Sequence, residues 1–191
     1  MKTTNQKHAN FLYVAFFVLL AALLGTSLNA SADVDTDDFI EEASAKGMGE
    51  VEAAKVALQK ATHSDVKDFA RKMIEDHTAA NKDLRALASK KNVELADDPE
   101  LMAQAKTAIL KQRDGESFDA AYVNNQIDAH KAALELYREA AESKDTDVRQ
   151  LAVASIPKLE KHLAKAEALV PVLAGSSANI KMDDDGKADH H

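Results

Sequence analysis

Residues 64–91 read SDVKDFARKMIEDHTAANKDLRALASKK, and the spacing of the apolar residues in this stretch decides the fold. These residues recur alternately four and three positions apart, which places them on one face of an α-helix. The face consists of Val66, Ala70, Met73, Ala80, Leu84 and Leu87, with His77 on the same track. The stretch therefore predicts a long amphipathic helix that buries one face and carries a histidine on it.

The same pattern recurs in other parts of the chain. We predict long helices over 36–62, 64–91, 117–143 and 146–172. In the third of these, the apolar face runs through Val123, Ile127, His130, Leu134, Tyr137 and Ala141. Four amphipathic helices of similar length predict an all-α four-helix bundle.

A fifth, shorter helix is expected between the second and third long helices. The sequence Asp98-Pro99-Glu100 is typical of a helix start, and Gly115 lies near the expected end. A simple up-and-down bundle needs only a short loop at this point. A connector of this length can return along the bundle, so we predict a ferritin-like bundle with a crossover.

The first 32 residues have the pattern of a signal peptide. Lys2 and Lys7 precede an unbroken apolar run over 11–24, and Ala30-Ser31-Ala32 fits the small-x-small rule for cleavage. The run has 14 residues, whereas a membrane span needs about 20. We therefore predict cleavage after Ala32, with an uncleaved membrane anchor as the alternative.

Composition narrows the classes of function. The chain has 191 residues, a net charge of −8 and no Cys, which excludes disulfides, thiol nucleophiles and cysteine-ligated metals. Removal of the signal leaves 159 residues with a net charge of −10, which argues against a nucleic-acid partner. We interpret the remainder as a periplasmic protein without stable membrane insertion, with a bundle over 33–174 and a disordered acidic tail over 175–191.

Polar residues interrupt the apolar faces at one place on each long helix. Glu50, His77, His130 and His162 each lie near the midpoint of a different helix. Since helix midpoints coincide whichever way the helices run, we expect these side chains at one level of the core. Three imidazoles and a carboxylate suit Zn, Fe, Mn or Cu, so we predict one metal site. Asp76 is a candidate to orient a ligand, or else lies at a solvated helix edge.

A metal-free interpretation stands beside this one. Glu50 could instead hydrogen-bond the histidines in a polar layer that fixes the register of the helices. The protein would then be a structural or protein-interaction module of the cell envelope. Enzymatic activity is the third hypothesis. It ranks last because it requires an open coordination position on the metal, which the sequence cannot reveal, and because the sequence indicates no catalytic residue. The leading hypothesis is metal binding linked to envelope stress or metal homeostasis.

Several short motifs resemble a known family. In chain order they are Gly47-Met48-Gly49-Glu50-Val51-Glu52, Val66-Lys67-Asp68-Phe69-Ala70, Asp76-His77, Phe118-Asp119-Ala120-Ala121-Tyr122, His130 and Ile156-Pro157-Lys158-Leu159-Glu160-Lys161-His162-Leu163. Over about residues 36–172 the chain resembles the bacterial family called domain of unknown function 4142. The resemblance implies an exported, ferritin-like helical domain and supplies no activity. Members are sometimes labelled outer-membrane proteins, but nothing in this sequence supports such an association.

The sequence departs from the di-iron proteins of the ferritin-like class. Those proteins carry a Glu three residues before each of two histidine ligands. In this chain the residues at that spacing before the three core histidines are Ile74, Ile127 and Leu159. We therefore expect a single metal ion at most, and no ferroxidase centre.

Overall fold

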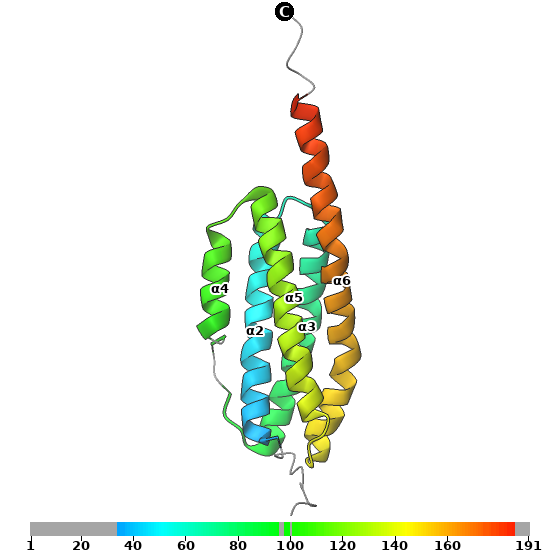
Figure 1. The fold of residues 1–191 in the computed structure, drawn as a ribbon. Helices are drawn as coiled ribbons and strands as arrows, with labels where there is room; N and C mark the ends of the chain where they lie inside the picture. The colour runs from blue at the N-terminus through cyan, green and yellow to red at the C-terminus, as the bar shows by residue number, and fades with distance from the viewer. Residues whose placement is uncertain (1–33, 96–97, 100, 186–191) are drawn as a thin grey trace, which may run out of the picture. The chain divides into compact units, whose positions relative to one another are not determined.

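The computed structural model describes residues 34–95, 98–99 and 101–185. Within these ranges the chain forms helices and no strand, which confirms the all-α prediction (Figure 1). The helices are α2 (Thr36–Lys60), α3 (Ser64–Lys91), α4 (Leu101–Lys111), α5 (Gly115–Ala140) and α6 (Thr146–Asp185). Among the described residues, no helix has both the length and the apolar character needed to cross a membrane. The predicted signal peptide and its cleavage site after Ala32 lie outside these ranges.

Two apolar clusters define the directions of the four long helices. The C-terminal halves of α2 and α6 share one cluster with the N-terminal halves of α3 and α5. The opposite halves of the same helices form the second cluster. Thus α2 and α6 run one way, while α3 and α5 run the other. Because α3 and α5 are parallel, the segment between them must return along the bundle, and α4 lies on that return path (Figure 1). The predicted ferritin-like crossover is confirmed.

The last helix differs from the prediction. We expected it to end near Val172 and to be followed by a disordered tail over 175–191. Instead, α6 continues through Gly175 to Asp185, beyond the expected end of the helix. A single Gly inside a helix costs only about 1 kcal/mol relative to Ala, so it does not stop a helix on its own. The remaining tail residues, 186–191, lie outside the described ranges.

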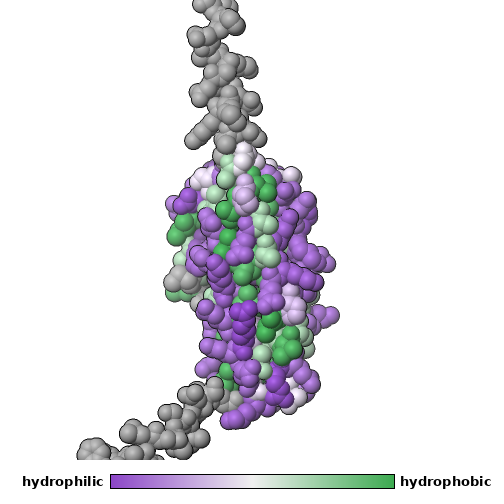
Figure 2. Space-filling model, turned by 45° about the vertical axis from the view of Figure 1, so that its right-hand side comes forward, coloured by the Kyte–Doolittle hydropathy of each residue, from purple (hydrophilic) through white to green (hydrophobic). Residues whose placement is uncertain are grey.

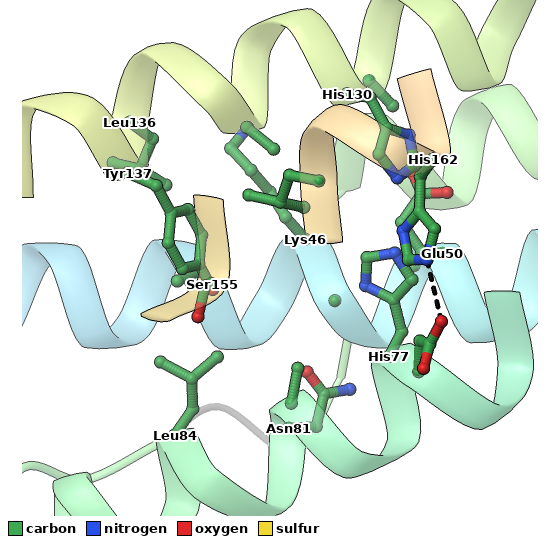
Figure 3. Close-up of a pocket in the computed structure, with 18 of the residues that line it drawn as sticks. Lys46, Glu50, His77, Asn81, Leu84, His130, Leu136, Tyr137, Ser155 and His162 are labelled. Carbon is green, nitrogen blue, oxygen red and sulfur yellow. Dashed lines mark hydrogen bonds and ion pairs between the residues drawn. The ribbon is translucent and has the colours of Figure 1, made fainter. Parts of the chain in front are cut away.

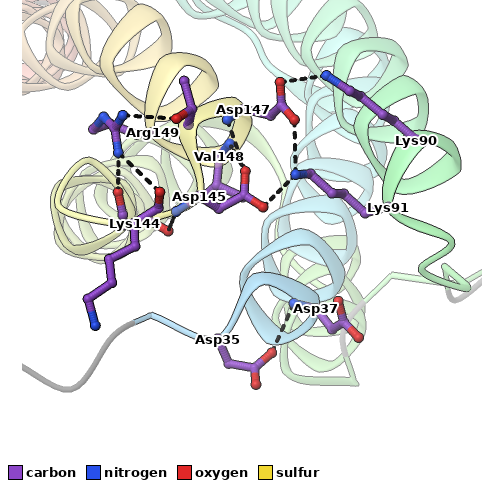
Figure 4. Close-up of polar contacts among 11 residues, drawn as sticks. Asp35, Asp37, Lys90, Lys91, Lys144, Asp145, Asp147, Val148 and Arg149 are labelled. Carbon is purple, nitrogen blue, oxygen red and sulfur yellow. Dashed lines mark hydrogen bonds and ion pairs between the residues drawn. The ribbon is translucent and has the colours of Figure 1, made fainter.

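Ion pairs join the end of α3 to the start of α6 (Figure 4). The Lys91 ammonium lies 2.5 Å from Asp145 Oδ2 and 2.9 Å from Asp147 Oδ2, and the Lys90 ammonium lies 2.6 Å from Asp147 Oδ1. Asp145 also caps α6, since its carboxylate accepts hydrogen bonds from the backbone N–H groups of Asp147 and Val148. These contacts fix the register of α3 against α6 at one end of the bundle.

A buried carboxylate holds the turn between α2 and α3 at the other end. Asp119 on α5 is 2% exposed. Its carboxylate accepts hydrogen bonds from Thr62 Oγ1 at 2.7 Å, from the Thr62 N–H at 3.1 Å and from the His63 N–H at 2.8 Å. The turn is therefore tied to the start of α5.

The surface of the bundle is mainly hydrophilic. Figure 2 shows one face on which hydrophobic residues form a narrow stripe along the helix direction, flanked by hydrophilic ones. This distribution is the one expected of amphipathic helices that direct their apolar faces inward.

The Asp119 contacts give the first prediction. Substitution Asp119→Ala leaves three donors of the α2–α3 turn without their acceptor, and should lower the free energy of unfolding by about 3 kcal/mol. Urea denaturation monitored by circular dichroism measures this loss. Asp128 is exposed on the same helix, so Asp128→Ala should change the free energy by less than about 0.5 kcal/mol. Equal effects of the two substitutions would contradict the assignment.

Candidate metal centre

Three histidines from three helices meet in the core between the two apolar clusters. His77 on α3, His130 on α5 and His162 on α6 are 8%, 1% and 5% exposed. Their ring centroids form a nearly equilateral triangle, with separations of 5.5 Å for His77–His130, 5.5 Å for His77–His162 and 5.3 Å for His130–His162. In Figure 3 the three rings turn toward one another at one end of a pocket. We call this group the histidine triad.

A backbone contact fixes the tautomer of His130. Its Nδ1 lies 2.8 Å from the carbonyl oxygen of Gln126, one turn earlier on α5. A carbonyl oxygen can only accept, so Nδ1 carries the proton and donates it. The lone pair of His130 is therefore on Nε2, which is buried and has no hydrogen-bond partner among the described residues.

A carboxylate fixes the tautomer of His162. Its Nε2 lies 2.9 Å from Asp76 Oδ2, and Asp76 is itself 7% exposed. Burial raises the pKa of Asp76, but hydrogen bonds from His162 and Lys72 and the charge of Lys158 outweigh it and hold the pKa below its usual value. The ionised carboxylate accepts, so Nε2 of His162 donates and the lone pair is on Nδ1. That atom is buried and has no partner in the part of the chain described.

One nitrogen of each triad ring lies close to a nitrogen of the other two rings. The third unpartnered nitrogen in the described core is His77 Nε2. One ligand atom from each histidine lies within 4.8 Å of the other two. A metal bound at about 2.0 Å from each nitrogen requires the nitrogens to be about 3.4 Å apart, so each ring would move inward by less than about 1 Å. The donor set and its geometry therefore fit one metal ion.

The electrostatics of the triad keep the rings neutral. Burial, together with the nearby His130 and His162, lowers the pKa of His77 to about 3. Burial also lowers the pKa of His130 to about 4, against the opposing effect of the Gln126 carbonyl. The pKa of His162 is lowered by burial as well, although Asp76 opposes the shift. Neutral imidazole is the form that binds a metal ion.

The structure brings together three of the four predicted ligands and places Glu50 differently. In the described part of the chain, the compact group of ligand atoms contains only the histidines. Glu50 Oε2 instead accepts a hydrogen bond from Gln126 Nε2 at 2.5 Å. Burial raises the pKa of Glu50 to about 7, although Gln126 and the charges of Lys106 and Lys46 oppose the shift. Glu50 thus contacts the residue that holds His130.

Sequence reasoning missed Gln126. This residue is 1% exposed and contacts both predicted groups, since its side chain binds Glu50 and its carbonyl binds His130. The predicted face of this helix ran through Val123 and Ile127, whereas Gln126 is buried and Ile127 is only half-buried. The available signal was the spacing of four between Gln126 and His130, which places both on one helix face.

The protein is a four-helix bundle with a crossover, and its core contains a buried histidine triad. The chain belongs to the family described as domain of unknown function 4142, whose family model matches residues 23–169. The resemblance inferred from the motifs is therefore confirmed. No curated protein matches the chain in sequence.

Two solved structures are similar in fold. One is the crystal structure of a DUF305 protein from Streptomyces coelicolor that is described as secreted, with a TM-score of 0.62 and 13% sequence identity over 71% of this chain and 91% of that one. The other is CopM in its Cu(I)-bound form, with a TM-score of 0.60 and 19% identity over 71% of this chain and 95% of that one. At these identities the likeness concerns the fold.

The lowered histidine pKa values predict how stability depends on pH. In the unfolded chain these rings bind protons below about pH 6.5, whereas in the folded chain His130 does so near 4 and His77 near 3. The unfolded state then binds more protons, so stability is fully present above pH 6.5 and is lost as the pH falls toward 4. Glu50, with its pKa raised from 4.5 to about 7, acts in the opposite direction.

His77 and His130 set against Glu50 leave a net loss of about 1 kcal/mol per pH unit between pH 6.5 and 5, and His162 adds to this loss because its pKa is also lowered. Urea denaturation of the metal-free protein in the presence of a chelator measures it. His130→Leu should make the dependence shallower, because it removes one of the buried rings. Constant stability between pH 8 and 5 would contradict buried neutral histidines.

Proposed function

We propose that this protein binds one transition-metal ion through His77 Nε2, His130 Nε2 and His162 Nδ1. The observation that carries the proposal is the close approach of three buried histidine rings, each of which has a nitrogen without a partner among the described residues. Each unsatisfied buried polar group costs about 1–3 kcal/mol, and a cation at the centre of the triad satisfies all three. Because the rings are neutral, no proton has to be removed before the ion binds.

Copper and zinc fit the triad better than iron or manganese. All three donors are imidazoles, and copper heads the affinity order of divalent ions for nitrogen sites, whereas manganese favours oxygen ligands. The carboxylate of Glu50 is hydrogen-bonded to Gln126, which leaves the donor set without oxygen. The structural similarity to CopM, solved with Cu(I) bound, supports copper as the first candidate.

The proposed setting is the periplasm, where the ion would be bound for metal homeostasis or for protection of the envelope against metal stress. The signal-peptide pattern before Ala32 supports export. The similar DUF305 protein is described as secreted. A site built only from histidine nitrogens suits an oxidising compartment, because it contains no thiol that could be oxidised.

Metal analysis tests the proposal directly. Untagged protein purified from the periplasm and incubated with Cu(I) or Zn(II) should contain about one equivalent per chain by elemental analysis. His77→Ala, His130→Ala and His162→Ala should each reduce the content at least tenfold in a competition assay with a chelator. The control is His63→Ala, outside the triad, which should retain the metal.

The metal analysis also distinguishes the proposed metal site from the metal-free alternative. Gln126 donates a hydrogen bond to Glu50 and accepts one from His130, and these contacts favour a polar layer that fixes helix register without an ion. In that case metal content stays below about 0.1 per chain, and a chelator leaves the melting temperature unchanged. His130→Leu would then keep or raise the stability, because an unpaired buried nitrogen is replaced by an apolar group.

Asp76 provides a separate prediction. Its carboxylate holds the His162 tautomer that leaves Nδ1 free, so Asp76→Asn should weaken metal affinity by about 10- to 100-fold. Titration against a competing chelator measures this change. Asp68 lies exposed on the same helix, and Asp68→Asn should leave the affinity within about twofold. Equal affinities for the two variants would show that Asp76 does not orient the ligand.

A further inference from the structure

The pocket in Figure 3 extends well beyond the triad. It is a chamber of about 590 Å³, with the three histidines at one end and Leu84, Leu136 and Tyr137 at the other. His77 and Leu84 are seven residues apart on α3, as are His130 and Tyr137 on α5. The chamber therefore runs for about 10 Å along the bundle axis from the triad.

Small residues create this space. On α3 and α5, the residues one step from the histidines toward the second apolar cluster are Ala80 and Ala133, and both line the chamber. Ala80 lies three positions from His77 and Ala133 three positions from His130, or about 4.5 Å of helix rise. Gly47 on α2 also lines the chamber, but the side chain of Asn81 already packs against it. Bundle cores are normally filled at this kind of position, because close packing stabilises the fold. A run of small residues beside a triad of unpartnered nitrogens leaves room for a guest.

The lining indicates the chemistry of that guest. Alanine and leucine are the commonest residues in the wall, which also carries the polar side chains of Lys46, Glu50 and Asn81. The part of a ligand that lies against the alanines and leucines must be apolar. The exposed charged residues Asp83, Lys106, Asp128 and Lys158 also line the chamber, which shows that it reaches solvent and that acidic and basic groups balance among these four. This balance favours a neutral molecule over a charged one.

We infer that the chamber binds a small neutral organic molecule whose apolar body lies against Ala80 and Ala133 and whose terminal nitrogen ligates the metal held by the triad. The second part of this inference rests on the proposed metal site. Three protein nitrogens leave a tetrahedral ion with one position for an added donor. A heteroaromatic compound of this kind would bind the ion through its ring nitrogen, and its apolar ring would pack against the alanine side chains of the wall.

The experiment compares imidazole with 4-phenylimidazole on the metal-loaded protein, using isothermal titration calorimetry. Both offer the same donor atom, and only the second has a body that reaches into the chamber. The dissociation constant of 4-phenylimidazole should be at least tenfold lower. Ala80→Leu fills the chamber and should abolish this difference with the metal content unchanged. Ala79→Leu, at an exposed position next to it, should preserve the difference. Equal constants for the two probes would overturn the inference.

A second measurement separates the chamber from the metal site. Propylbenzene has no donor atom, so it should bind the metal-free protein through the chamber alone, and Ala80→Leu should prevent this binding. A protein that binds propylbenzene but no metal would retain the chamber and overturn both the ligation and the proposed function. A protein that binds metal but neither aromatic probe would overturn the chamber and leave the proposed function intact.

Discussion

The rest of the structure depends on three imidazole rings that share a small buried volume. Burial keeps His77, His130 and His162 neutral, and two of them have their protons fixed by the Gln126 carbonyl and the Asp76 carboxylate. The three rings meet because they come from three helices at one height. Such an arrangement stays unsatisfied until a cation, a proton donor or water fills its centre. The polar layer thus destabilises the metal-free fold, and a bound ion would reverse this effect on the free energy of folding.

Much of the fold followed from local sequence. The four-three spacing over 64–91 predicted a helix with the same bounds as α3, and the length of the connector predicted the crossover that α4 makes. The end of α6 was not predictable in this way. Gly175 is only a weak helix breaker, and whether a helix continues past it depends on small propensity differences over many residues.

The site was predictable in part. The three histidines could be found because each breaks an apolar face at the midpoint of its helix, and midpoints coincide. Gln126 was missed because α5 has apolar residues on adjacent tracks, so a rotation of the helix by one position cannot be resolved from sequence. The contact between Asp76 and His162 depends on which helices are neighbours and on side-chain rotamers, and neither is encoded in the spacing along one helix.

Because of the crossover, an ion bound at the triad would report whether the two helical hairpins are docked. His77 belongs to the α2–α3 hairpin, whereas His130 and His162 belong to the α5–α6 hairpin. Neither hairpin alone contains the full set of nitrogens, so the site exists only after the two have docked. Release of an ion would therefore report the separation of the two hairpins. A spectroscopic signal from bound metal would measure tertiary assembly, whereas circular dichroism measures helix content.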